Sequence, residues 1–248
     1  MLRTNEPDLV ILSVMGKVSH PVKGSRPFVL GHDGEVLLLP GVGGITYNKR
    51  IGDVCVGLAA DHVEPGVSTM NTDKAEGYAD AYNRAYNALA CIGNVATIVT
   101  GDAKGDRGVP GLLHRMPIEE RDGCLRIGVA KMVPGKIMGS GLGSEQTWTG
   151  DYDIQLFDEQ TVEEYGLADL RFGDFVAVLD TDHTFGRIYK QGAVSIGIVV
   201  HSDCYTSGHG PGVTTLLTTK VPGKIEAHVD PGANLATILG IAPRVRPE

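Results

Sequence analysis

Short runs of apolar residues, separated by glycine, proline and polar residues, dominate the pattern along the chain. Most runs are rich in β-branched side chains, which suits strands that are half-buried or buried in a sheet. Strands are expected over residues 8–18, 35–39, 53–58, 95–100, 125–131, 175–179, 193–200 and 213–218. The pattern therefore predicts a chain built mainly from β-strands.

One segment has the spacing of an amphipathic helix instead. Apolar residues recur three and four positions apart over residues 75–89, and Asp73 can cap the start of such a helix. Gly93 can end it. We expect one clear helix over about residues 73–92 and a shorter one over 158–165. With the strands, these helices predict an α+β, mainly β fold with mixed or antiparallel sheets in a barrel-like arrangement.

The length of 248 residues suits one large domain or two small ones. Residues 52–62 and 173–183 share a pattern: Gly-Asp, then an apolar strand with leucine at the same place, then Asp-His. A second repeated pattern has a different separation along the sequence. The two repeats therefore do not establish that one half of the chain is a duplicate of the other. We expect a single compact unit over 1–248, with two intertwined β-rich halves, about 1–124 and 125–248, as the alternative.

Charge and cysteine content exclude several classes of protein. Lysine and arginine number 22 against 30 aspartate and glutamate residues, a formal net charge of −8. This balance argues against nucleic-acid binding, which relies on basic side chains that neutralise phosphates. The apolar run over residues 9–15 is far shorter than the roughly 20 residues that span a membrane. The four cysteines form no C-x-x-C pair and suit a reducing compartment, so we expect a cytoplasmic protein without membrane or nucleic-acid partners.

The strongest candidate chemistry lies in histidines beside aspartates. Two of the eight histidines follow aspartate where a strand is expected to end, a third ends a strongly apolar strand, and a fourth lies in a glycine-rich loop. If these ends converge, they offer ligands for a divalent Zn, Mn or Fe ion, or a metal-free acid–base set. Each histidine alone could equally be an ordinary loop residue. The candidate catalytic residues are His62, His183, His201, His209, Asp61, Asp182 and Asp203, and the four histidines are also the candidate metal ligands.

Two loops are candidates for binding a substrate. Gly208, Gly210 and Gly212 let the backbone approach a ligand, and their N–H groups could surround an anion, although a tight turn between strands needs the same residues. Lys104 and Arg107 could hold an anionic substrate in another polar loop, which could equally be a solvated surface turn. Neither a G-x-G-x-x-G pattern nor a P-loop is present, so no nucleotide cofactor is expected.

Several motifs are specific enough to suggest a family. Residues 172–178, 201–203 and 208–212 read FGDFVAV, HSD and GHGPG, and further matches extend upstream to residues 40–44 and the Asp-His pair at 61–62. With these motifs the chain resembles a prokaryotic family of uncharacterised proteins, catalogued as a domain of unknown function. The resemblance implies a soluble homo-oligomer and transfers no catalytic residue.

These observations lead to three expectations of different kinds. The first is a small-molecule enzyme, a hydrolase or related lyase, that acts on a small polar metabolite through a His/Asp site, either with one divalent metal or by metal-free acid–base catalysis. The alternative is a noncatalytic protein that binds a small anion or other ligand through the same loops. A structural homo-oligomer, joined by strand edges and the alanine-rich face of the helix, is a third possibility.

Overall fold

The structure is a computed structural model, which describes residues 5–21, 28–40, 44–60, 62–73, 81–90, 92, 94–107, 112, 115–147 and 149–241. We call residues 5–107 the N-terminal region and residues 112–241 the C-terminal region. The N-terminal region contains a 3-10 turn (Glu6–Asp8), β1 (Lys17–Val18), β2 (Val29–Leu30), β3 (Val36–Leu37), β4 (Ile45–Thr46), β5 (Gly66–Val67), β6 (Thr69–Met70) and α1 (Ala81–Leu89). The C-terminal region contains β7 (Ile118–Arg121), β8 (Cys124–Val129), β9 (Lys131–Pro134), a 3-10 turn (Gly135–Ile137), β10 (Tyr152–Asp153), α2 (Glu159–Glu164), β11 (Phe175–Asp182), β12 (Ile188–Val199), β13 (Gly212–Thr219), β14 (Ile225–Val229) and α3 (Leu235–Leu239).

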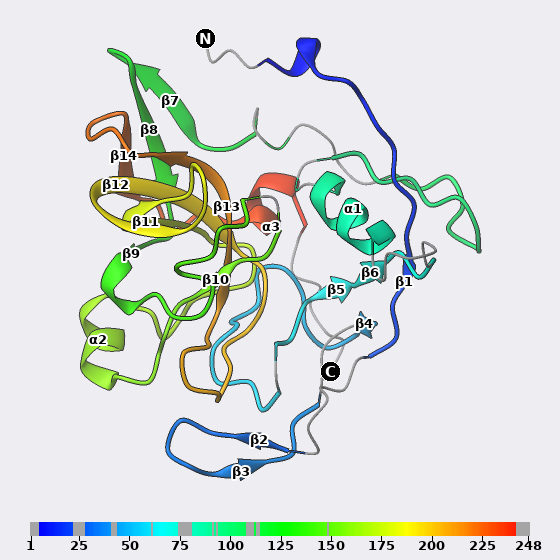
Figure 1. The fold of residues 1–248 in the computed structure, drawn as a ribbon, viewed down its shortest axis with the longest axis horizontal. Coiled ribbons are helices and arrows are strands. Elements are labelled where there is room, and N and C mark those ends of the chain that lie inside the picture. The colour runs from blue at the N-terminus through cyan, green and yellow to red at the C-terminus, as the bar shows by residue number, and fades with distance from the viewer. Residues whose placement is uncertain are drawn as a thin grey trace.

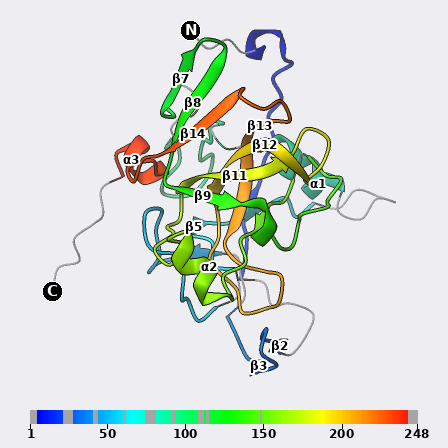
Figure 2. The ribbon, with the colours of Figure 1, turned by 90° about the vertical axis from the view of Figure 1, so that its left-hand side faces the viewer.

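Two sheets form the body of the C-terminal region (Figures 1 and 2). The larger has the strand order β10-β13-β12-β11-β9 and is antiparallel except for the β9–β11 pair. The smaller has the order β14-β8-β7, with β14 parallel to β8. The sheets curl into about half of a barrel, so the prediction of a mainly β fold with mixed, barrel-like sheets is confirmed.

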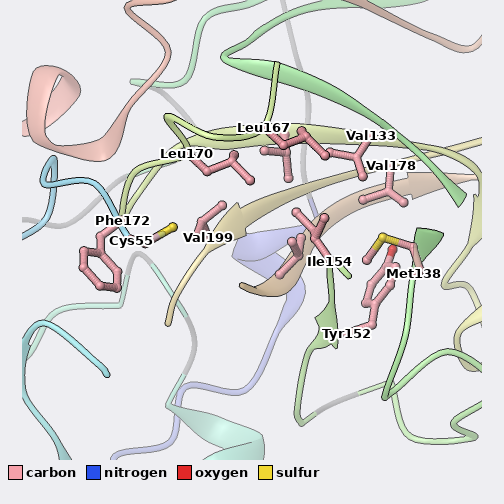
Figure 3. Close-up of a cluster of buried hydrophobic side chains, with 12 residues drawn as sticks. Cys55, Val133, Met138, Tyr152, Ile154, Leu167, Leu170, Phe172, Val178 and Val199 are labelled. Carbon is pink, nitrogen blue, oxygen red and sulfur yellow. The ribbon is translucent and has the colours of Figure 1, made fainter. Parts of the chain in front are cut away.

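Strand β11, in the interior of the larger sheet, is buried on both faces. Along β11, Val176 and Val178 belong to one buried apolar cluster, which Figure 3 shows, whereas Phe175 and Ala177 belong to another that also contains Ile127 of β8. Because side chains alternate between the faces of a strand, a continuous apolar run places residues on both sides. The second cluster therefore fills the space between the two sheets.

The N-terminal region is built differently. Its strands are two residues long and pair only into two-stranded ladders, β1–β6, β2–β3 and β4–β5. Of its described residues, Ser19, Gly31, Gly44 and Cys55 are buried. The helix α1 has no buried residue. The described part of this region therefore has no core of its own comparable with that of the C-terminal region.

Several predicted elements match the structure and others do not. The strands predicted over 125–131, 175–179, 193–200 and 213–218 correspond to β8, β11, β12 and β13, and the short helix predicted over 158–165 contains α2. The strands predicted over 8–18, 53–58 and 95–100 are wrong, since they contain only β1 and isolated bridges at Val54 and Thr97. An apolar run becomes a strand only when an edge is available to pair with it.

The longer helix is confirmed in part. It is described as α1 over Ala81–Leu89, whereas residues 74–80, where the sequence predicts its first turns, lie outside the described residues. Among the described helices, none is both long and apolar enough to cross a membrane.

Candidate functional site

The pairing of β10 with β13 brings two aspartates beside a histidine. Asp153 of β10 lies opposite Gly212 of β13, and the N–H of Val200, just after β12, donates to the carbonyl of Gly212 at 2.9 Å. Asp151 and Asp153 are two residues apart along an extended strand, so they face the same side. The sheet therefore places both carboxylates next to His201, the residue after Val200.

Both ring nitrogens of His201 have polar partners. Its Nδ1 lies 2.8 Å from the carbonyl oxygen of Ser202, and its Nε2 lies 2.8 Å from Asp151 Oδ2 and 3.7 Å from Asp153 Oδ1. A carbonyl only accepts, so Nδ1 carries a proton and donates it to Ser202. Nε2 then faces carboxylates, so either a second proton or a cation must lie between them.

The N-terminal region contributes His62 to the same place. The Ser202 N–H donates to the carbonyl of Val63, and the Val63 N–H donates to Ser202 Oγ, each at 2.9 Å. The ring of His62 lies 4.5 Å from that of His201. His62 has a φ of 53°, a left-handed conformation that is unusual for a residue other than glycine. The chain thus turns at this residue, and the turn directs its imidazole to the cluster.

His209 lies at the edge of the same cluster. Its ring is edge-on to that of His62 at 5.4 Å, and its Nδ1 lies 4.0 Å from Asp153 Oδ1. That nitrogen is buried and has no hydrogen-bond partner among the described residues. The Gly210 N–H donates to Asp153 Oδ1 at 3.3 Å, so this glycine helps to position the carboxylate.

Three of these residues have the arrangement of a ligand set. Among the described residues, His62, Asp153 and His201 each offer a ligand atom, and these atoms all lie within 4.8 Å of one another. Asp153 and His201 are buried, whereas His62 is half-buried. Two imidazoles and one carboxylate are a donor set that Zn, Mn and Fe(II) accept in proteins.

The charges within the cluster depend on one another. Burial raises the pKa of Asp153, and the negative charge of Asp151 adds to this rise. Burial alone would raise the pKa of Asp151 too, but the hydrogen bond and charge of His201 lower it below its usual value. Burial would lower the pKa of His201, but Asp151 raises it above its usual value. The Asp151–His201 pair is therefore a buried ion pair beside a more readily protonated Asp153.

Gly212 allows this pair to form. A Cβ atom built on Gly212 would overlap His201 Nε2 and Asp151 Oδ2. A Cβ atom on Gly210 would likewise overlap the backbone carbonyl of Ile154. These two glycines, which the sequence suggests as part of an anion-binding loop, are thus positions where the chain passes close to neighbouring groups. Gly208 has a φ of +80° and open space where its Cβ would lie.

The structure places His183 and Asp182 outside the cluster of three. His183 Nε2 lies 3.3 Å from the carbonyl of Gln146, and its ring is edge-on to Tyr152 at 6.1 Å. Asp182 Oδ1 accepts from the Thr184 N–H at 3.1 Å, a local turn. Burial lowers the pKa of His183. Both residues have structural contacts at the end of β11.

None of the other described candidate residues belongs to the cluster of His62, Asp153 and His201. Asp203 Oδ2 accepts from the Gly57 N–H at 2.6 Å, so it fixes the loop that leads to His62. Lys104 and Arg107 belong to an exposed turn closed by the Thr97–Arg107 bridge, which Figure 1 draws at the right-hand edge, beyond α1. Asp61 lies outside the described residues.

Sequence analysis missed Asp151 and Asp153. The signal was present as an Asp-x-Asp pattern, which places two carboxylates on one face of an extended segment. It also missed Arg187, which is buried and donates from Nη2 to the carbonyl of Thr149 at 2.7 Å. The positive charge of Arg187 contributes to the low pKa of Asp151.

Fold and site together define a mainly β protein with a His–Asp–His cluster at one end of its larger sheet. The chain belongs to the DUF4438 family, a domain of unknown function: the N-terminal family model matches residues 28–114 and the C-terminal one matches residues 115–239. This result confirms the family resemblance seen in the sequence. A solved structure described as the crystal structure of TM1086 is similar, with 34% identity, a TM-score of 0.84, and coverage of 96% of this chain and 98% of that chain. A search of the curated proteins found no match.

Proposed function

We propose that this protein is a metal-dependent small-molecule enzyme, a hydrolase or a related lyase, with its metal held by His62, Asp153 and His201. The observation that carries the proposal is the approach of their three ligand atoms to within 4.8 Å of one another. Clusters of titratable groups with perturbed pKa values concentrate at functional sites, which also supports it.

The surroundings of His201 suit a metal ligand. The hydrogen bond from Nδ1 to Ser202 fixes the ring and leaves the lone pair of Nε2 for an ion, an arrangement typical of histidines that bind metals. Asp151 Oδ2 lies 2.8 Å from Nε2, which is the distance of a hydrogen bond, whereas two ligands of a tetrahedral ion lie about 3.4 Å apart. Asp151 is the proposed fourth ligand, and it would move slightly away from Nε2 as the ion replaced the proton between the two groups.

Three protein ligands would leave a position for water on a four-coordinate ion, and four would leave one on a five- or six-coordinate ion. A zinc ion held there would lower the pKa of such a water to about 7 and so supply hydroxide at neutral pH. Hydrolysis would form a bond from the water oxygen to a polarised carbon of the substrate, the bond from that carbon to the leaving group would break, and the proton would pass to the leaving group. His209 would carry that proton, since it is a further imidazole whose ring lies 5.4 Å from that of His62. The half-buried His62 marks the side from which a small polar metabolite would enter.

The alternative is a noncatalytic protein that binds a small anion. The observation that favours it is the Asp151–His201 pair, which satisfies both ring nitrogens with a proton alone. In that case the cluster of imidazoles would attract an anionic ligand without breaking a bond.

Metal-stripped protein, reloaded with Zn, Mn or Fe(II), provides the test. Binding would be measured by calorimetry, and turnover with a panel of small esters, amides and lactones. We expect Asp153→Asn to lower metal affinity by about 10-fold or more and to abolish turnover, whereas His183→Gln, the matched control, should retain both. Equal turnover by stripped and loaded protein would contradict the metal mechanism. Tight ligand binding without turnover of any substrate would favour the alternative.

A further inference from the structure

The segment over residues 9–15, which we call the N-terminal arm, exposes a continuous apolar sequence. It reads LVILSVM, and Val10 is 85% exposed and Ile11 is 93% exposed. Side chains alternate between the faces of an extended chain, so these two neighbours point to opposite sides. The arm is thus exposed on both faces, and one flat surface could not cover it.

The backbone of the arm also lacks hydrogen-bond partners among the described residues. No backbone group of residues 9–14 hydrogen-bonds to another described residue, and at the end of the arm the carbonyl of Met15 accepts from Asn71 Nδ2 at 3.0 Å. Figure 1 shows the arm in blue along the outer side of the molecule, past α1 and away from the two large sheets. An extended apolar segment with free N–H and C=O groups is the kind of segment that adds to a sheet as a strand.

The N-terminal region exposes many more large apolar side chains than the C-terminal region. Of the described large apolar residues that are exposed, 21 lie in the N-terminal region and six in the C-terminal region. Exposed apolar side chains gathered in one region mark a surface that another molecule covers.

We propose that the N-terminal arm inserts as a strand into a second copy of this chain, in an arm exchange that makes the protein an obligate homo-oligomer. The arm needs cover on both faces whenever the protein is folded, and a second copy is the partner always present in equal amount. Each molecule has a net charge of −8, but the stretch between Asp8 and Lys17 has no charged side chain. The arm can therefore approach another copy without repulsion from its own residues.

The test is the mass of the full chain in solution, measured by size exclusion with light scattering. Wild type should have the mass of two or more chains at micromolar concentration. Val10→Asp places a charge in the arm and should shift the mass to one chain, or lower the affinity between chains by at least 10-fold. Val221→Asp is the matched control, because Val221 is 50% exposed in a turn after β13, and it should keep the wild-type mass.

Amide hydrogen exchange of the wild type gives a second readout that needs no variant. In the exchanged strand, the amides of residues 9–15 should exchange at least 100-fold more slowly than in a free segment. A monomeric wild type, an oligomer that Val10→Asp leaves intact, or unprotected arm amides would each overturn the proposal. A monomer that cosediments with phospholipid vesicles would assign the arm to a membrane surface and would also overturn it.

Discussion

The two regions of the molecule contain similar apolar sequences but use them differently. In the C-terminal region, runs such as that of β11 lie in the middle of a sheet and are buried on both faces. In the N-terminal region, the run over residues 9–15 is exposed, and the short strands around it pair only two by two. An apolar run therefore indicates that a segment is to be buried, but it does not identify the chain that buries it.

The candidate site lies where the two regions meet. His201, Asp151 and Asp153 come from the C-terminal region and are positioned by the register of its sheet. His62 comes from the N-terminal region and is positioned by the hydrogen bonds between Val63 and Ser202. The region without a core of its own thus supplies His62 to the cluster only because it docks on the region that has one.

The largest expected effect compares the cores directly. Ile196, on β12, is fully buried, whereas Ile45, on β4, is 48% exposed. Ile196→Ala should lower the free energy of unfolding by about 2–5 kcal/mol, and Ile45→Ala should change it by no more than about 0.5 kcal/mol. Denaturant titration measures both. Equal losses would show that the N-terminal region has a packed core after all, and the comparison would fail.

The next prediction concerns the close approach at Gly212. Gly212→Ala should push His201 and Asp151 apart, because the new methyl group would occupy the space of both side chains. We expect a loss of about 1–3 kcal/mol in unfolding free energy and the loss of metal binding. Gly208→Asn is the control, because its Cβ meets open space and asparagine tolerates the positive φ. If Gly212→Ala kept the wild-type metal affinity, the close approach of Asp151 and His201 would not be needed for the metal site.

A smaller effect should appear in the pH dependence of stability. Burial lowers the pKa of His183, so the unfolded chain binds this proton more readily than the folded one. The stability linked to His183 is therefore present above the ordinary histidine pKa of about 6.5 and lost as the pH falls below it. His183→Gln should flatten the decline in unfolding free energy between pH 7 and 5. His228→Gln, at an exposed position on β14, should keep the wild-type slope. An unchanged slope in His183→Gln would contradict its buried neutral state.

The smallest effect concerns cysteine reactivity across the two regions. Cys55 is a buried apolar residue of the N-terminal region, and burial raises the pKa of its thiol. Cys124 on β8 is only half-buried. A thiol reagent should modify Cys124 at least about tenfold faster than Cys55, since the thiolate is the reactive form. Mass spectrometry of labelled peptides would show the order, and rapid labelling of Cys55 would mean that its loop does not stay docked on the C-terminal region.

Much of the C-terminal region could be predicted from sequence, for a physical reason. The segments that became β11, β12 and β13 are long, β-branched and bounded by glycine, so local pattern and final environment agree. The run over residues 95–100 has the same local pattern, yet it contains only one isolated bridge. Strand pairing depends on distant partners, which no local pattern contains.

The candidate site, too, could be predicted from local sequence patterns only in part. Histidines at strand ends and in a glycine-rich loop led to the prediction that His62, His183, His201 and His209 converge. The structure brings three of them together and leaves His183 outside. Asp151 and Asp153 were missed because β10 is two residues long and has no apolar run to mark it. Its pairing with β13, about 60 residues away, could not be inferred from either segment alone.

The most direct test of the central claim is the metal content of the protein, purified without added metal or chelator. Elemental analysis should find about one Zn, Mn or Fe per chain in the wild type, and far less in Asp153→Asn, which removes one carboxylate ligand. No bound metal in the wild type, together with no thermal stabilisation on adding any of the three, would contradict a metal site at His62, Asp153 and His201.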